Sequence, residues 1–209
     1  MTFSLAGICE RTGMVGIAVS SSSPAVAARC AHARAGAGAA ASQNVTDPRL
    51  GPLLLDALEA GEPADRAVAR IAASAPHAAY RQLTAVDTAG RTGAVAAGNL
   101  LAALAVPGAM VDAFAAQPDA HLADRLLAGM RAGLDAGGEE GPIHSAGMLV
   151  CHREAWPVTD LRVDWDDDPI GRLGELWALW KPQADDYVTR ALDPESAPSY
   201  DVPGDLAAP

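Results

Sequence analysis

Few histidine and serine residues stand at spacings that could support nucleophilic chemistry. His144 and Ser145 are adjacent at the start of an apolar segment. Neighbouring residues of a strand point to opposite faces, so the two make a poor nucleophile–base pair. His144 could still line a pocket, with a purely structural role as the alternative. The other four histidines show no ligand spacing. We therefore predict no metal and no cofactor.

The cysteines and one acidic cluster have structural interpretations that we favour. Cys9, Cys30 and Cys151 are odd in number and far apart, unlike a metal motif or a secreted disulfide framework. We interpret them as small hydrophobic residues in a reducing compartment, and a catalytic cysteine is the alternative. The four aspartates among residues 164–168 could attract a cation. However, Asp168 before Pro169 is typical of a helix N-cap followed by a first-turn proline, in a solvated loop.

Length and charge limit the possible classes of protein. At 209 residues, one domain with a C-terminal extension is expected. The net charge of −11 disfavours a nucleic-acid surface, which needs a basic patch. The first residues lack the basic and long apolar regions of a signal peptide, and no apolar stretch reaches membrane-spanning length. We therefore expect a cytoplasmic protein with no membrane or nucleic-acid partner.

The period of the hydrophobic residues predicts which segments position these side chains. Residues 2–9 and 14–20 read as a hairpin whose tight turn contains Gly13, because glycine tolerates the positive φ of such a turn. Residues 36–43 are predicted to be a strand made of small residues. Two helices follow, one ending at Gly61 and one beginning at Pro63. A second strand–turn–strand unit spans residues 80–95.

The rest of the chain repeats this alternation of helices and strands. Residues 106–114 and 122–134 are predicted helices, 145–151 and 159–165 are predicted strands, and 170–180 is a helix. Residues 1–180 are predicted to form the domain. The extension, 181–209, holds five of the 15 prolines and is predicted to wrap in extended form or to be partly disordered. Strand pairs that are grouped apart from helix pairs indicate an antiparallel α+β layered fold.

Several motifs in order resemble one known family. They are TFSLAG, GIAVSS, ARAGAGAAASQN, YRQLTAVDTAGRTGA, AGNLLA, HSAGMLV and DLRVDWDDDP, and they extend from Thr2 to about Trp180. The chain resembles the uncharacterised DUF1028 family, which is placed in the Ntn-hydrolase superfamily. This resemblance implies an α+β fold in the form of a four-layer αββα sandwich. In one departure, Val95 leads almost directly into Gly98 and Asn99, where relatives have a longer segment that could contribute to a pocket.

The resemblance implies that Thr2 is the catalytic residue. In Ntn hydrolases the first residue of the processed chain attacks an amide carbonyl, and its α-amine accepts the proton. An α-amine titrates near pH 8, close enough to neutrality for this role. Thr2 follows Met1 directly, and its side chain is small enough for Met1 to be removed. The alternative is that Thr2 is an ordinary strand residue and Met1 is retained.

Further polar residues are candidates to line a pocket beside Thr2. Each has a structural alternative, such as turn capping for the amides and serines or a surface salt bridge for the arginine. The candidates are Ser20, Ser21, Arg34, Gln43, Asn44, Asn99 and His144.

Two functional hypotheses follow from these residues and motifs. The first is an amidohydrolase that acts on a small amide or short peptide, with Thr2 as nucleophile and base. The alternative is a non-catalytic protein of the same fold that binds a small ligand or assembles. A homodimer is expected in either case, because aromatic residues are enriched in such interfaces and four tryptophans, Trp156, Trp165, Trp177 and Trp180, lie late in the chain. The alternative for Trp177 and Trp180 is a place in the core.

Overall fold

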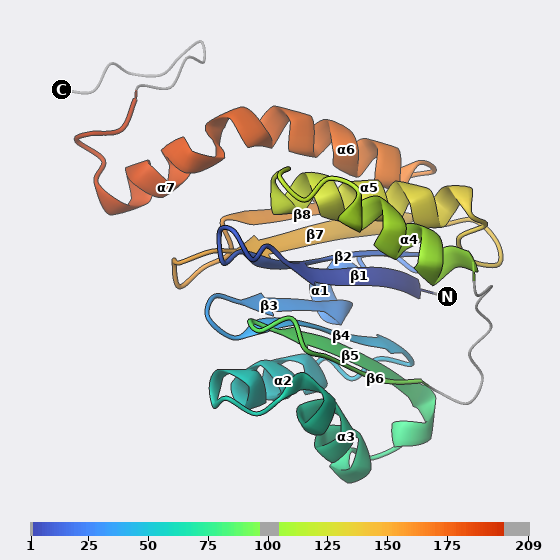
Figure 1. The fold of residues 1–209 in the computed structure, drawn as a ribbon. Coiled ribbons are helices and arrows are strands. Elements are labelled where there is room, and N and C mark those ends of the chain that lie inside the picture. The colour runs from blue at the N-terminus through green and yellow to red at the C-terminus, as the bar shows by residue number, and fades with distance from the viewer. Residues whose placement is uncertain (1, 97–104, 199–209) are drawn as a thin grey trace.

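The computed structural model describes residues 2–96 and 105–198, which form two four-stranded antiparallel sheets with helices (Figure 1). The first sheet has the order β1-β2-β7-β8, and the second has the order β3-β4-β5-β6. The strands are β1 (Thr2–Ile8), β2 (Val15–Ser21), β3 (Ala31–Arg34), β4 (Gly38–Asn44), β5 (Arg81–Asp87), β6 (Thr92–Val95), β7 (Ser145–Cys151) and β8 (Thr159–Val163).

Helices lie on the outer side of each sheet (Figure 1). One group packs against the first sheet: α4 (Ala105–Ala115), α5 (Leu122–Asp135) and α6 (Pro169–Trp180). The other group packs against the second sheet: α2 (Leu50–Glu59) and α3 (Ala64–Ser74). The shorter elements are α1 (Ala27–Cys30), two 3₁₀ turns, η1 (Ala78–Tyr80) and η2 (Lys181–Gln183), and α7 (Ala184–Leu192). Among the described helices, none is long and apolar enough to span a bilayer.

The period-2 alternation of the strands divides the core into separate interfaces. In β2, Ile17 and Val19 point between the sheets, whereas Ala18 points outward to the helices of the first sheet. In β4, Ala39 and Ala41 point between the sheets and Ala40 packs against α2 and α3. These small, fully buried alanines allow the two sheets to approach each other closely.

The mixed α+β fold class predicted from the sequence is confirmed. The opening hairpin also forms as predicted, with Gly13 at a φ of 77°. The short elements α1 and β3 were not predicted, because the alanine-rich segment before Gly36 carries no clear period. Residues 184–192 form α7, so this part of the extension is helical rather than extended; none of its residues is buried, which explains its weak hydrophobic pattern.

The four tryptophans do not share one environment. Trp177 is buried and Trp180 packs at the edge of the same cluster. Trp156 and Trp165 are exposed.

Candidate functional site

The polar residues nearest Thr2 meet at one end of the first sheet. β1 begins there, β2 ends there and β7 begins there, and the register pairs Thr2 with Ser21 and Ser21 with Ser145. Ser21 shares the face of Ile17 and Val19, which points toward the second sheet. Thr2 shares the face of Ala6 and Ile8, which pack against the same inter-sheet cluster. The Thr2 and Ser21 side chains therefore lie together between the sheets.

A chain of hydrogen-bonded hydroxyl groups begins at Thr2. Thr2 Oγ1 lies 3.0 Å from Ser21 Oγ, and Ser21 Oγ lies 3.0 Å from Ser23 Oγ. The guanidinium of Arg29 donates to Ser23 Oγ over 2.9 Å. Arg29 also donates to the carbonyls of Pro24 and Ala25, so its position is set by the loop after β2. A cation therefore stands at the far end of the hydroxyl chain.

Gln43 reaches Thr2 from the second sheet. Its Oε1 accepts a hydrogen bond of 2.8 Å from the Ser4 hydroxyl, and its Nε2 donates to the backbone carbonyl of Thr2 over 3.4 Å. Gln43 is buried and shares the inward face of Ala39 and Ala41, because residues two apart on a strand point the same way. Its amide is thus held in one orientation beside the candidate nucleophile.

Two other predicted residues point away from this site. Ser20 alternates with Ser21, faces the helices of the first sheet, and donates to the carbonyl of Ser145 over 2.9 Å. Asn44 alternates with Gln43, ends β4 with a φ of 68° and is exposed. Ser20 and Asn44 therefore have the structural role that the sequence analysis gave as the alternative, at the end of a strand or in a turn.

Arg34 is not brought to Thr2, which corrects the sequence-based hypothesis. It pairs with Gly38, at the end of β4 opposite to Gln43. Its guanidinium forms ion pairs with Asp56 (2.8 Å) and Glu59 (2.7 Å) of α2. The carboxylate hydrogen bonds, Asp56 first, raise the pKa of Arg34. Arg34 is therefore a surface salt-bridge residue, and Arg29 is the cation linked to Thr2.

His144 lies at the edge of the site with its ring directed elsewhere. Its backbone N–H donates to the Ser21 carbonyl over 2.8 Å. Its imidazole stacks on Trp165 with ring centres 4.3 Å apart. Its Nδ1 is 3.5 Å from the carboxylate of Asp167, a distance too long for a direct hydrogen bond. The backbone of His144, rather than its ring, contacts the strand that carries Ser21.

Sequence reasoning did not single out Ser4, Ser23 and Arg29 as members of the site. Ser4 could have been found, because it lies two residues after Thr2 and residues two apart on a strand share a face. Ser23 and Arg29 depend on the loop between β2 and α1, whose path no local pattern indicates. Asn99, the remaining candidate, lies outside the described residues. Over residues 2–96 and 105–198, no three acidic, histidine or cysteine side chains are grouped so as to hold a metal ion.

A separate cavity of about 590 Å³ opens on the other side of the second sheet, between α2, α3 and the loop after β4. Leu50, Ile71 and Pro76 supply apolar walls. The charged lining residues are Asp47, Asp56, Arg49 and Arg70, and both guanidinium groups are ion-paired, Arg49 with Asp47 and Arg70 with Glu62. Its volume is in the range of small-molecule sites.

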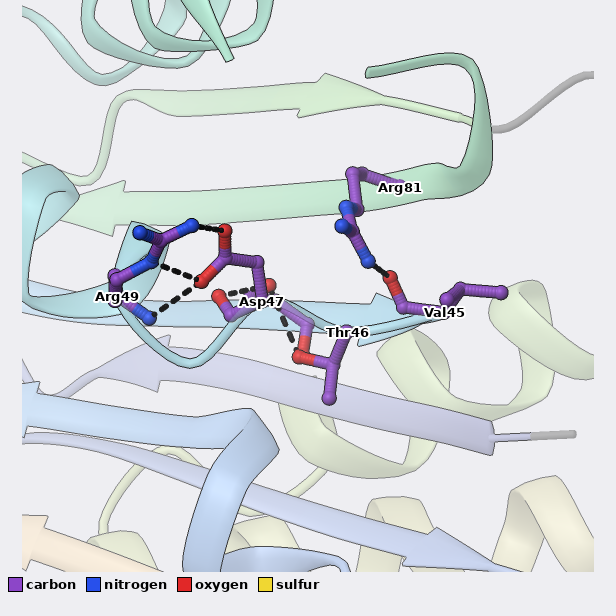
Figure 2. Close-up of polar contacts among 6 residues, drawn as sticks. Val45, Thr46, Asp47, Arg49 and Arg81 are labelled. Atoms are coloured by element: carbon purple, nitrogen blue, oxygen red, sulfur yellow. Dashed lines mark hydrogen bonds and ion pairs between the residues drawn. The ribbon is translucent and has the colours of Figure 1, made fainter. Parts of the chain in front are cut away.

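The loop at this cavity is held by hydrogen bonds from several directions (Figure 2). Asp47 accepts bonds from Arg49 Nε and Nη2 at 2.9 and 2.7 Å, and these side-chain bonds lower the pKa of Asp47 to about 2. Thr46 donates to the Ser42 carbonyl, and Arg81 donates to the carbonyl of Val45. The loop therefore presents Arg49 to the cavity in a defined position.

The comparisons with known proteins identify the family. The model of the family of unknown function DUF1028 matches residues 2–95 and 91–173. The chain belongs to the DUF1028 family. It is 30% identical to protein SPO2555 from Silicibacter pomeroyi, a DUF1028 protein of solved structure, with a TM-score of 0.78 over 86% of this chain and 89% of that one. No curated protein matches the chain.

The DUF1028 match spans the strands and loops that build the Thr2 site. Thr2, Ser21, Arg29 and Gln43 lie in its first segment, and Ser145 lies in its second. The two matched segments meet at residues 91–95, just before the position where the sequence departs from the family motifs.

Proposed function

We propose that this DUF1028 protein is an N-terminal-nucleophile amidohydrolase on a four-layer αββα sandwich of Ntn type. The observation that carries the proposal is the position of Thr2. It opens β1 on the face between two helix-covered sheets, with its hydroxyl 3.0 Å from Ser21 Oγ. A threonine at that position can supply both a nucleophilic oxygen and, once Met1 is removed, a neighbouring α-amine.

The proposed reaction uses groups of Thr2 alone for its covalent steps. The α-amine takes the proton of the Thr2 hydroxyl, and Oγ1 bonds to the carbonyl carbon of a small amide or short peptide. The resulting ammonium returns the proton to the leaving nitrogen as the carbon–nitrogen bond breaks, which leaves an ester on Thr2. Water, deprotonated by the same amine, then releases the acid and restores the hydroxyl.

The surrounding residues orient Thr2 in this proposal. Ser21 holds the hydroxyl, and Gln43 holds the backbone carbonyl of Thr2. The guanidinium of Arg29, at the end of the hydroxyl chain, favours an oxygen that gains negative charge.

The test combines intact mass with a reactivity measurement. We expect the untagged protein to lack Met1, and we expect a panel of amino-acid amides and short peptides to contain a substrate whose hydrolysis Thr2→Ala abolishes. Thr2→Ser is the matched control, because it keeps the hydroxyl and the amine and should retain turnover. Retention of Met1 in all molecules, or equal hydrolysis by Thr2→Ala, would contradict the proposal.

The cavity beside α2 and α3 favours a second candidate function, the binding of a small ligand without turnover. A carboxylate-bearing ligand would bind there by displacing Asp47 from Arg49 or Glu62 from Arg70, the ion pairs that occupy both guanidinium groups beside the apolar walls. We expect a panel of small carboxylic acids to raise the melting temperature of the wild type and of Arg66→Ala, an exposed position on the same helix, but not of Arg70→Ala. Equal shifts in all three proteins would exclude binding at this cavity.

We also propose that the protein is a homodimer. Trp156 and Trp165 are exposed large aromatic residues, the kind of side chain that is enriched in such interfaces. Sedimentation equilibrium should give twice the chain mass for the wild type. A wild type of single-chain mass at micromolar concentration would contradict this expectation.

A further inference from the structure

Ser145, the first residue of β7, places a buried hydroxyl beside the Thr2 site. Its side chain is fully buried, with 0% of its surface exposed. The register sets it opposite Ser21, and residues opposite each other in an antiparallel pair share a face of the sheet. Ser145 therefore stands next to the serine that binds the Thr2 hydroxyl, on the side that faces the second sheet. The covalent steps proposed for Thr2 make no use of it.

The Ser145 hydroxyl closes the loop that follows β2. It donates to the backbone carbonyl of Ser23 over 2.6 Å and accepts a bond of 3.2 Å from the backbone N–H of Val26. One hydroxyl thus holds both ends of residues 23–26. The Arg29 guanidinium bonds to this same segment, through Ser23 Oγ and two backbone carbonyls. The position of the guanidinium therefore follows the position of the segment.

The backbone of Ser23 is held from both sides by serines of neighbouring strands. Its N–H donates to Ser21 Oγ over 3.2 Å, and its carbonyl accepts the bond from Ser145 Oγ. The Ser23 side chain is the link between Ser21 and the Arg29 guanidinium. The place of Ser23 in the hydroxyl chain therefore depends on both of its backbone bonds.

The loop needs this support because Ala25 has a strained backbone. Its φ is 51°, in the left-handed region, where a Cβ lies too close to the following carbonyl oxygen. Such conformations persist where surrounding bonds hold them, and they are frequent at functional sites. The N–H of Ala25 donates to the carbonyl of Asp164, just after β8, over 3.0 Å. The loop is therefore held by β7 through Ser145 and by the end of β8.

We infer that Ser145 is a positioning residue that sets the Ser23–Arg29 end of the hydroxyl chain relative to Thr2. The inference rests on the proposed function, in which the Thr2 hydroxyl reacts and the Arg29 guanidinium favours the negative charge that develops on oxygen. Loss of the two Ser145 bonds releases residues 23–26 at both ends, so that Ser23 and the guanidinium move together relative to Ser21. The effect on Thr2 passes through Ser23 and needs no contact between Ser145 and the substrate.

The first measurement follows Arg29 directly and needs no reaction. In the NMR spectrum of the wild type, the Arg29 Nε–H group should have a high order parameter, because the guanidinium is held by the loop. In Ser145→Ala we expect this order parameter to fall below about 0.6, the range of flexible groups. Ser20→Ala is the matched control and should keep the wild-type value. It removes another fully buried hydroxyl that bonds to a backbone carbonyl, on the opposite face of the sheet.

The second measurement shows whether these bonds act on Thr2. The probe is a β-lactone, whose ring opens as the Thr2 oxygen bonds to its carbonyl carbon and the hydroxyl proton passes to the released alkoxide. In protein processed to Thr2, acylation should slow about fivefold in Ser145→Ala, the factor for one ordinary hydrogen bond, and stay unchanged in Ser20→Ala. In Ser23→Ala, which lacks the linking hydroxyl, adding Ser145→Ala should have no further effect. A purely structural role would slow acylation equally in both backgrounds.

The outcomes separate this inference from the enzyme proposal. Equal Arg29 order parameters in wild type and Ser145→Ala, or equal slowing of acylation with and without the Ser23 hydroxyl, overturn the inference. If Thr2 of the wild type forms no ester, the enzyme proposal fails, and the Arg29 measurement still decides whether Ser145 positions the guanidinium. If Ser145→Ala does not fold, Ser145→Cys takes its place. A thiol is a weaker donor and acceptor, so the order parameter should fall there too, and an unchanged value overturns the inference.

Discussion

Ser4 of β1 donates a hydrogen bond of 2.8 Å to Oε1 of Gln43 in β4, and this bond joins the two sheets beside Thr2. The amide group of Gln43 is oriented by it, because an amide whose oxygen is occupied must turn its nitrogen the other way. That nitrogen meets the Thr2 carbonyl. The geometry of Thr2 is therefore determined by both sheets.

The paired serines at the end of β2 allow a test of the hydroxyl chain. Ser21→Ala removes the hydrogen-bond partner of Thr2 Oγ1, and we expect acylation of that hydroxyl by an amide-hydrolase inhibitor to slow about fivefold. That factor corresponds to a hydrogen bond of about 1 kcal/mol. Ser20→Ala removes a hydroxyl of the same strand that faces the helices, so it should change stability alone. Equal acylation rates in Ser21→Ala and wild type would contradict the role of Ser21.

Asp87, at the end of β5, should make stability depend on acidity. It accepts hydrogen bonds from Arg91 Nε at 2.7 Å and from the backbone N–H groups of Ala64, Ala89 and Arg91. Burial tends to raise its pKa, but these bonds outweigh burial and lower it. Ionised Asp87 therefore contributes its full share of the folding stability above the pKa that the group has in the unfolded chain, about 3.9. This stability is lost as the pH falls below that value.

Urea denaturation should show this effect. At pH 7, Asp87→Asn is expected to lower the free energy of unfolding by about 2 kcal/mol, the range for bonds to a charged group. At pH 3 the difference between variant and wild type should shrink. A difference that stays constant from pH 7 to pH 3 would show that ionisation of Asp87 is not its source.

Gly93 of β6 should not tolerate a side chain. A Cβ there would lie 2.4 Å from the carbonyl oxygen of Ala64, and this backbone atom belongs to the start of α3 and cannot move aside cheaply. We expect Gly93→Ala to destabilise the protein by about 1–3 kcal/mol. Gly108→Ala in α4 is the control, since its Cβ meets no atom within 4 Å and helix propensity should stabilise it by up to about 1 kcal/mol. Differential scanning calorimetry should show opposite shifts.

Asp124 of α5 should anchor the end of α6. It accepts bonds of 2.7 Å from Trp177 Nε1 and from Lys181 Nζ. Asp124→Ala leaves the indole N–H of a buried tryptophan unpaired, which costs about 1–3 kcal/mol. Asp124→Asn keeps an acceptor oxygen and should lose less. Thermal unfolding followed by tryptophan fluorescence measures both, and equal losses would show that the acceptor is unimportant.

Local patterns in the sequence predicted much of the fold and part of the site. The hairpin around Gly13 and the helix beginning near Pro169 follow from turn and cap residues that act over a few positions. Thr2 was found through the resemblance to the family, and Ser21 and Gln43 were found as polar residues at strand ends beside it. Arg29 was not found, since its position depends on the loop after β2. Arg34 was misplaced because sequence order does not show which end of β4 faces Thr2.

The alanines of β4 have a consequence for how this site could be altered. Ala39 and Ala41 line the contact between the sheets and are fully buried, so one added methyl group there would act as a wedge. The separation of the sheets controls whether the amide of Gln43 reaches Thr2. A larger side chain at Ala41 or Ala39 would therefore move the sheets apart and weaken the contact between Gln43 and Thr2. No residue that touches Thr2 would have been changed.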